Sequence, residues 1–203
     1  MELPSTTLAQ AVEALASLPG VGRRTALRLA LHLLKTPPEE VENIALALHR
    51  LTTDIRYCNI CHCVSDTDIC PVCSSPKRVQ GIVCVVENVQ DVMAIENTQQ
   101  YRGLYHVLGG VISPIDGVGI RDLNIDSLLQ RIHDGHPAPV EEVILALPTT
   151  MEGDTTNYYL NKQLQPLGVK VTTIARGIAI GANLEYADEI TLGRSIANRI
   201  PFE

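Results

Sequence analysis

The first residues of the chain carry two short apolar stripes at helical spacing, separated by a break. After the capping candidates Ser5 and Thr6, apolar side chains recur three and four residues apart, at Leu8, Val12, Leu15 and Ala16. The stretch 18–22 interrupts this pattern with a proline and two glycines. A second stripe then follows, at Ala26, Leu29, Ala30 and Leu33. The pattern predicts two helices joined by a tight hairpin.

A third helix is expected directly afterwards. Its start is predicted from Thr36 as the N-cap, Pro37 at the first helical position and Glu39 two residues later. This helix is expected to bury one apolar face, formed by Val41, Ile44, Ala45, Leu48 and Leu51.

The second half alternates apolar runs with helical stretches. Residues 82–86 are apolar throughout, as in a strand buried on both faces. Further strands are expected at 105–108, 143–147 and 169–175, with one helix ending near residue 96 and another at 168. Because strand and helix alternate, the sheet is predicted to be mostly parallel. The fold class is therefore α/β, preceded by a helical N-terminal region.

Four of the six cysteines form two closely spaced pairs. Cys58 and Cys61 make one CxxC, and Cys70 and Cys73 make another after eight intervening residues. Two such pairs can present four thiolates tetrahedrally to one Zn²⁺ ion. The ion replaces the apolar core that roughly twenty residues cannot build alone. With four cysteine ligands the site is closed, so the predicted zinc is structural.

Other uses of these cysteines stay open. Two disulfides are disfavoured because a reducing cytosol is expected. A redox CxxC would open a helix in a thioredoxin-like context, which this sequence lacks. His62 and Cys63 are competing ligands, although neither fits the paired spacing as well. Cys84 lies inside the apolar run 82–86 and is interpreted as a buried small residue.

The glycine hairpin has a use in binding phosphate. Gly20 and Gly22 carry no side chains, so backbone N–H groups can approach a phosphate closely, and the next helix adds the positive end of its dipole. Arg24 and Arg28 are four apart and share the helical face beside that place, with Arg23 preceding them. The alternative is a plain turn with solvated arginines. The string LPGVGRRTALRLALHLL resembles the helix-hairpin-helix family of DNA binders, which implies contact with the DNA backbone and no base reading.

Charge and composition narrow the choice of partners. The net charge is -7, with eight basic and eight acidic residues in 1–79 but eight and fifteen in 80–203. Any DNA contact must therefore be a local patch, because phosphate binding depends on nearby Lys and Arg. Aromatic residues make up only 3%, which disfavours stacking platforms for single-stranded bases.

No apolar run approaches the ~20 residues that span a bilayer. No signal peptide begins the chain, so a cytoplasmic protein without membrane partners is expected.

Acidic residues follow two of the predicted strands. Glu87 ends the first strand, with Asp91 four residues on, and Glu152 and Asp154 follow the third strand. Because ligand-binding loops lie at the carboxyl ends of parallel strands, we expect these acids to converge. Clustered carboxylates can hold Mg²⁺. The alternative is that they are solvated loop acids that cap the next helix.

This half is similar to the Toprim fold of topoisomerases and primases. Toprim enzymes place a glutamate after the first strand, which Glu87 matches, and an Asp-x-Asp pair directly after a later strand. Residues 148–150 here read Pro-Thr-Thr, and the acids come later, which argues against metal-dependent catalysis. No GxxxxGK[ST] occurs, so an independent ATPase is disfavoured. A Toprim-type Mg²⁺-dependent nuclease, primase or topoisomerase remains the alternative function.

The order of these parts closely resembles the RecR family of bacterial recombination mediators. The matching strings are LPGVG, C-x2-C-x8-C-x2-C, YRGLYHVLGG, TTMEGDTT and LEYADEITLGR. The predicted organisation is a helix-hairpin-helix DNA-binding domain (1–54), a C4 zinc finger (55–79), a Toprim-like domain (80–175) and a C-terminal assembly segment (176–203).

The resemblance also implies a function without catalysis in DNA repair. RecR-like proteins form dimers and ring-like tetramers that encircle DNA, and they act with RecO and RecF in loading RecA at single-strand gaps. The family's basic hairpin residues correspond to Arg24 and Arg28, and its Toprim acids, which face RecO, to Glu87 and Glu152. The expected location is the cytoplasm, at the nucleoid. A scaffold whose hairpin never meets DNA is a third hypothesis.

Overall fold

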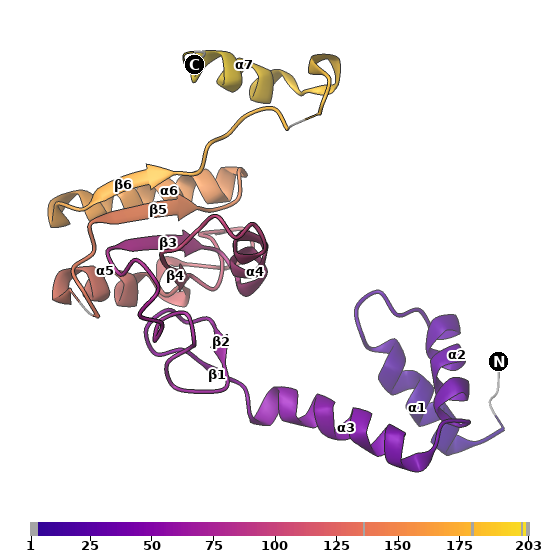
Figure 1. The fold of residues 1–203 in the computed structure, drawn as a ribbon. Coiled ribbons are helices and arrows are strands. Elements are labelled where there is room, and N and C mark those ends of the chain that lie inside the picture. Colours follow the sequence, from indigo (N-terminus) through magenta and orange to yellow (C-terminus); the bar gives the residue numbers. More distant parts are fainter. Residues whose placement is uncertain (1–3, 136, 180, 200, 202–203) are drawn as a thin grey trace. The chain divides into compact units, whose positions relative to one another are not determined.

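The chain folds into two compact units, Met1–Ile55 and Arg56–Glu203. A computed structural model describes residues 4–135, 137–179, 181–199 and 201. Figure 1 traces the elements of each unit along the chain. Within the described residues, every helix is too short or too polar to cross a bilayer.

From residue 4 onward, the first unit consists of the helices α1 (Thr6–Ala16), α2 (Arg23–Leu33) and α3 (Pro38–Thr53). The Ser5 hydroxyl accepts a hydrogen bond from the Leu8 amide and caps α1, as expected for serine at this position. The core of the unit is small: Val12, Ala26 and Ala30 are buried, and the neighbouring apolar side chains of α1 and α2 cover them partly. Small residues at this contact let α1 and α2 pack closely.

The predicted start and packing of α3 are wrong. The Thr36 hydroxyl donates to the carbonyl of His32 at 3.1 Å, so it closes the end of α2, and Pro37 takes the N-cap position without a side-chain bond. None of the residues of α3 is buried. Val41 is half-buried, whereas the other apolar side chains expected in a core are exposed: Ile44, Ala45, Leu48 and Leu51. A unit of three short helices buries only the contact between α1 and α2.

The second unit begins with the cysteine-rich segment. Strands β1 (Arg56–Tyr57) and β2 (Val64–Ser65) pair antiparallel, with Arg56 opposite Ser65. We call residues 56–75 the knuckle. Its buried residues include all four cysteines of the two CxxC pairs, which form a small core of their own.

The rest of the second unit is a four-stranded parallel sheet, as predicted. The strand order is β4-β3-β5-β6, and all neighbouring pairs are parallel. The strands are β3 (Ile82–Val86), β4 (Leu104–Val107), β5 (Glu142–Ala146) and β6 (Lys170–Thr173). Each lies within two residues of the expected position at its start and end. The fold class predicted from the sequence is confirmed.

Helices cover both faces of this sheet (Figure 1). On one face, Val83, Leu104 and Val143 pack in one core with residues of α5 (Ile125–Asp134) and α6 (Met151–Leu164). On the other, Cys84 and Tyr105 pack with α4 (Val89–Asn97). Cys84 is buried among apolar side chains, as expected from its place in the run. The sheet thus positions the loops at its carboxyl edge and supports the knuckle at its β4 side.

Short elements complete the chain. The 3₁₀ turns among the described residues are η1 (Ile120–Asp122), η2 (Gln165–Leu167) and η3 (Leu184–Tyr186). The last helix is α7 (Glu189–Ala197), which Asp188 caps by accepting a hydrogen bond from the Thr191 amide at 2.8 Å.

Candidate functional site

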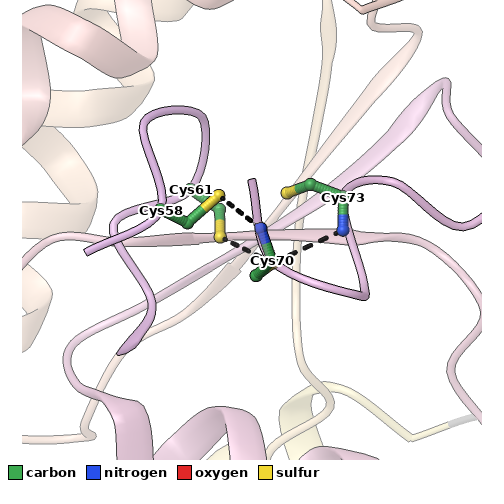
Figure 2. Close-up of side chains that lie close together, drawn as sticks. All are labelled: Cys58, Cys61, Cys70 and Cys73. Carbon is green, nitrogen blue, oxygen red and sulfur yellow. Dashed lines mark hydrogen bonds between the residues drawn. The ribbon is translucent and has the colours of Figure 1, made fainter. Parts of the chain in front are cut away.

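The four cysteines of the two CxxC pairs form one buried cluster. Cys58, Cys61, Cys70 and Cys73 are between 0% and 5% exposed, and their sulfur atoms all lie within 4.8 Å of one another. Figure 2 shows the four side chains directed toward a common centre. A tetrahedral zinc site with Zn–S bonds of ~2.3 Å has S–S edges of ~3.8 Å. The Cys61–Cys70 Sγ–Sγ distance is 3.6 Å, which fits such a site.

The backbone of the knuckle fixes these sulfur atoms. The amide of Cys58 donates to the carbonyl of Cys63 at 2.8 Å, and that of His62 donates to the carbonyl of Cys58 at 2.9 Å. His62 has a φ of 59°, and this left-handed residue turns the chain directly after Cys61. The amide of Cys70 donates to Cys58 Sγ at 3.3 Å. Amide donors to sulfur favour the thiolate form that binds metal.

The electrostatics of the cluster favour a shared negative charge. Hydrogen bonds with neighbouring thiols, led by that of Cys61, lower the pKa of Cys70. The same bond, with burial, raises the pKa of Cys61. Because four crowded thiols cannot all ionise without a cation, a divalent metal ion is the natural partner of this donor set. We conclude that the residues present fit a structural zinc ion.

The competing ligands lie outside this quartet. Cys63 and His62 do not belong to the group of four sulfur atoms. The His62 Nε2 atom shares a hydrogen bond of 2.8 Å with the hydroxyl of Ser127 on α5. All six cysteines are free thiols in the structure, which therefore does not contain the two disulfides of the alternative interpretation.

The hairpin between α1 and α2 places glycines where the prediction needs them. Gly20 has a φ of 79°, a left-handed conformation that favours glycine, and the Val21 amide donates to the carbonyl of Leu18 at 3.0 Å. Gly22 is the N-cap of α2 and supplies no side-chain cap. The first-turn amides of α2 therefore lack an intrahelical partner.

The arginines of α2 differ in their contacts. Arg23 lies 3.8 Å from a carboxylate oxygen of Glu13, with both side chains largely exposed. Arg24 and Arg28 are exposed and four residues apart on the helix. Both are thus available to a partner beside the glycine hairpin.

The carboxylates divide into two pairs with different surroundings. Burial raises the pKa of Glu87, at the end of β3, and Asp91 raises it further. Asp91 itself accepts a hydrogen bond from the Asn88 amide at 3.0 Å and forms a capping box at the start of α4. Glu152 is half-buried in the first turn of α6.

Asp154 is held by arginines of the C-terminal segment. Arg176 donates to one of its oxygens at 2.6 Å, and Arg194 on α7 lies 3.4 Å from the other. Hydrogen bonding to Arg176, aided by Arg194, lowers the pKa of Asp154. Of the part of the chain that the structure describes, the cysteine quartet alone gathers three or more metal-ligating side chains, so the four acids do not assemble an ion site.

Sequence reasoning missed two of these partners and one buried cation. Arg176 and Arg194 had no predicted contact with Asp154. Arg131 on α5 is only 6% exposed. Its signal was present: it lies three residues after Leu128 and directly before Ile132, within the apolar stripe of an amphipathic helix. A charged residue at such a position indicates a buried partner.

Family models match the chain from one end to the other. The helix-hairpin-helix model of RecR matches residues 8–52, and the RecR model of a zinc finger domain with four cysteines matches 55–75. The Toprim domain model matches 81–175, and the C-terminal model of RecR matches 177–200.

Curated relatives are similar over nearly the whole length. A protein named "Recombination protein RecR" from Porphyromonas gingivalis is 61% identical over 198 residues, which cover 98% of this chain and 94% of the relative. One of the same name from Bacteroides thetaiotaomicron is 57% identical over 201 residues, covering 99% and 97%. That from Flavobacterium johnsoniae is 54% identical over 203 residues, covering 100% and 97%. Identity of this extent, together with the order of the four matched regions, means that the chain belongs to the RecR family of recombination proteins.

Proposed function

We propose that the protein is a DNA-binding recombination mediator that acts in DNA repair without catalysis. The observation that carries this proposal is the hairpin of the first unit, where Gly20 and Gly22 precede a helix start with free amides and two exposed arginines. Backbone amides, the helix dipole and guanidinium groups all recognise phosphate. None of these groups contacts base edges, so binding to the DNA backbone does not depend on the DNA sequence.

Arg24 and Arg28 are proposed to make the main ionic contacts, because both are exposed and lie on one helical face. Arg23 adds a weaker contact, since it is already beside Glu13. Gly20 and Gly22 provide close backbone approach. One copy carries few such groups, so we propose that dimers or ring-like tetramers surround DNA and gain affinity through effective concentration.

The cysteine quartet is proposed to hold a structural zinc ion. Cys58, Cys61, Cys70 and Cys73 would supply four thiolates, and the ion would keep the knuckle folded. Since all four ligand positions are filled by sulfur, such a zinc ion has no open position for a substrate.

Partner binding is proposed to involve acidic residues of the second unit. Residues 80–203 carry fifteen acidic and eight basic residues, which favours a basic partner and steers its approach. We propose that Glu87 and Glu152 face RecO, and that the assembly acts with RecO and RecF to load RecA at single-strand gaps at the nucleoid. Asp91 and Asp154 contribute less directly, because Asp91 caps α4 and Asp154 binds two arginines.

The lack of catalysis is supported by the end of β5. Residues 148–150 read Pro-Thr-Thr where Toprim enzymes have an Asp-x-Asp pair, and Asp154 is neutralised by Arg176 and Arg194. Cleavage, relaxation or primer synthesis that depends on Mg²⁺ and is abolished by Glu87→Gln would favour the alternative of a Toprim-type enzyme.

The DNA-binding proposal is tested with Arg24→Ala combined with Arg28→Ala. Binding to labelled gapped duplexes of two unrelated sequences is measured by fluorescence anisotropy over a salt series. We expect a similar loss of affinity on both sequences and a shallower salt dependence, by about one unit of slope for each lost phosphate contact. The matched control is Arg102→Ala with Arg121→Ala, two exposed arginines of the second unit. Unchanged affinity in the hairpin variant, or equal loss in the control, contradicts the proposal.

A further inference from the structure

A buried arginine lies where the knuckle meets the parallel sheet. Arg131 on α5 is 6% exposed, and its Nη1 donates to the carbonyl of Tyr105 on β4 at 2.8 Å. Among the described residues, its Nε and Nη2 atoms find no hydrogen-bond partner. A guanidinium group removed from water needs a compensating negative charge, because desolvation penalises the charged form strongly.

The cysteine cluster lies beside the same small cavity as Arg131. Asn59 and Ile60, the two residues between Cys58 and Cys61, line this cavity together with Arg131. Burial lowers the pKa of Arg131, and negative charge on the sulfur atoms of Cys73, Cys61 and Cys58 opposes this shift. The two histidines nearby, His62 and His106, cannot balance a guanidinium, because an imidazole is either neutral or positively charged.

Charge balance makes the same point from the metal side. Four thiolates and one Zn²⁺ carry a net charge of −2, which is costly in a buried site unless cations or N–H donors surround the sulfur atoms. Arg131, which lines a cavity with Asn59 and Ile60 of the knuckle, carries one positive charge and has two buried donor atoms without a hydrogen-bond partner among the described residues.

We propose that Arg131 is the buried counter-ion of the zinc–tetrathiolate group and that it links zinc binding to the stability of the parallel sheet. This inference rests on the proposed structural zinc. The charge on Arg131 lowers the free energy of the four-thiolate state, and the hydrogen bond of its Nη1 atom ties that state to β4. Arg131 is thus a positioning residue for the metal site and supplies no ligand atom.

The link to the sheet is visible at strand β4. β4 is an edge strand, and an edge exposes unpaired N–H and C=O groups. The amide of Val107 donates to the carbonyl of Cys61 at 2.8 Å, while the carbonyl of Tyr105 accepts from Arg131. The ring of His62 also packs edge-on against that of His106 at 5.2 Å. The knuckle and Arg131 together therefore close the outer edge of β4.

The test compares Arg131→Met with Arg131→Lys in the full chain. Methionine removes the charge at similar volume, whereas lysine keeps the charge but lacks the planar guanidinium group with its several N–H donors. Zinc affinity is measured by competition with a chromogenic chelator at fixed pH. We expect Arg131→Met to weaken zinc binding about 10- to 100-fold, as is typical for outer-shell partners, and Arg131→Lys to restore most of the loss. Arg121→Met, which removes an exposed arginine of the same unit, should bind zinc as the wild type does.

A second readout follows the sheet. Hydrogen exchange of the β4 amides is compared before and after chelation, in the wild type and in Arg131→Lys. Chelation should speed exchange at Leu104–Val107 and leave α1 and α2 unchanged, because these helices belong to the other unit. This measurement remains informative even if Arg131→Met does not fold.

Each outcome decides the inference. Wild-type zinc affinity in Arg131→Met overturns it, and so does equal weakening in the methionine and lysine variants, which would indicate a packing role. Asp134 lines the same small cavity as Arg131. If Asp134→Asn destabilises the sheet while Arg131→Met keeps its zinc affinity, the negative partner of Arg131 is the Asp134 carboxylate and the inference is wrong. Wild-type protein that contains no zinc refutes the zinc site itself, whereas zinc-loaded protein with an indifferent Arg131 refutes only this inference.

Discussion

Replacing Gly22 with alanine should weaken DNA binding and leave the first unit folded. Gly22 has φ −71° and ψ 157°, which alanine also adopts, and within the described chain no heavy atom lies within 4 Å of the position that its Cβ would take. Reduced freedom of the unfolded chain favours alanine by roughly 0.4–1 kcal/mol. Alanine is a poorer N-cap residue than glycine by roughly the same amount. The free energy of unfolding should therefore change by less than about 0.5 kcal/mol.

On DNA the same methyl group stands where a phosphate would approach the free amides of α2. Losing one hydrogen bond to a charged group costs about 1.5–3 kcal/mol. That range corresponds to a dissociation constant raised roughly 10- to 100-fold. Fluorescence anisotropy with a labelled gapped duplex measures the affinity, and thermal unfolding of the same sample measures the stability.

Two further alanine variants act as controls. Gly20 has a φ of 79°, so Gly20→Ala should destabilise the unit by about 1 kcal/mol and lower its Tm. Gly119→Ala changes another N-cap glycine with a negative φ, at the start of η1 in the second unit, and should not change DNA binding. If folded Gly22→Ala binds DNA with wild-type affinity, the backbone of the hairpin does not approach phosphate and the reasoning fails.

Two other predictions concern the second unit. Asp154→Ala should release α7, and hydrogen exchange of the α7 amides should then be faster than in a Glu185→Ala control. The loss of folding stability should be only ~0–1 kcal/mol, because the ion pairs of Asp154 are partly exposed. Unchanged exchange would contradict a docking role for Asp154. Hydrogen bonding to Arg78 lowers the pKa of Glu96, so its stabilisation is complete above the ordinary pKa of 4.5 and is lost as the pH falls through the lower folded value. Urea unfolding across the acid range should show a flatter pH dependence in Arg78→Gln, and an identical slope would exclude this pair as a source of acid sensitivity.

The sheet and the cysteine quartet were predictable because their signals are local. A run such as 82–86 is apolar at every position, which few structures except a doubly covered strand accommodate. The spacing of two CxxC pairs likewise restricts four sulfur atoms to one small volume. In both cases residues close together in the sequence indicate the structure, and no contact between distant parts of the chain is needed to predict it.

The errors arose where two local rules compete or where a distant partner decides. Thr36 satisfies the rule for an N-cap, yet its hydroxyl is equally able to bond the carbonyl of His32 and does so. The stripe that includes Ile44 and Leu48 has the period of a buried face, but periodicity does not say whether a partner surface exists. The ion pair between Asp154 and Arg194 joins residues forty positions apart, and no local pattern indicates it.

The charge distribution limits how such a chain can hold DNA. Residues 1–55 carry five basic and six acidic side chains, so even the unit with the hairpin has no net positive charge. Its attraction for phosphate is confined to the cluster around Arg24 and Arg28, within the ~8 Å over which charges act at physiological salt. We therefore expect a single copy to bind weakly and the proposed assembly, with several hairpins on one DNA molecule, to bind tightly. The dependence of DNA binding on protein concentration should accordingly be steeper than that of a one-site equilibrium, and a simple hyperbola at all concentrations would mean that one hairpin suffices.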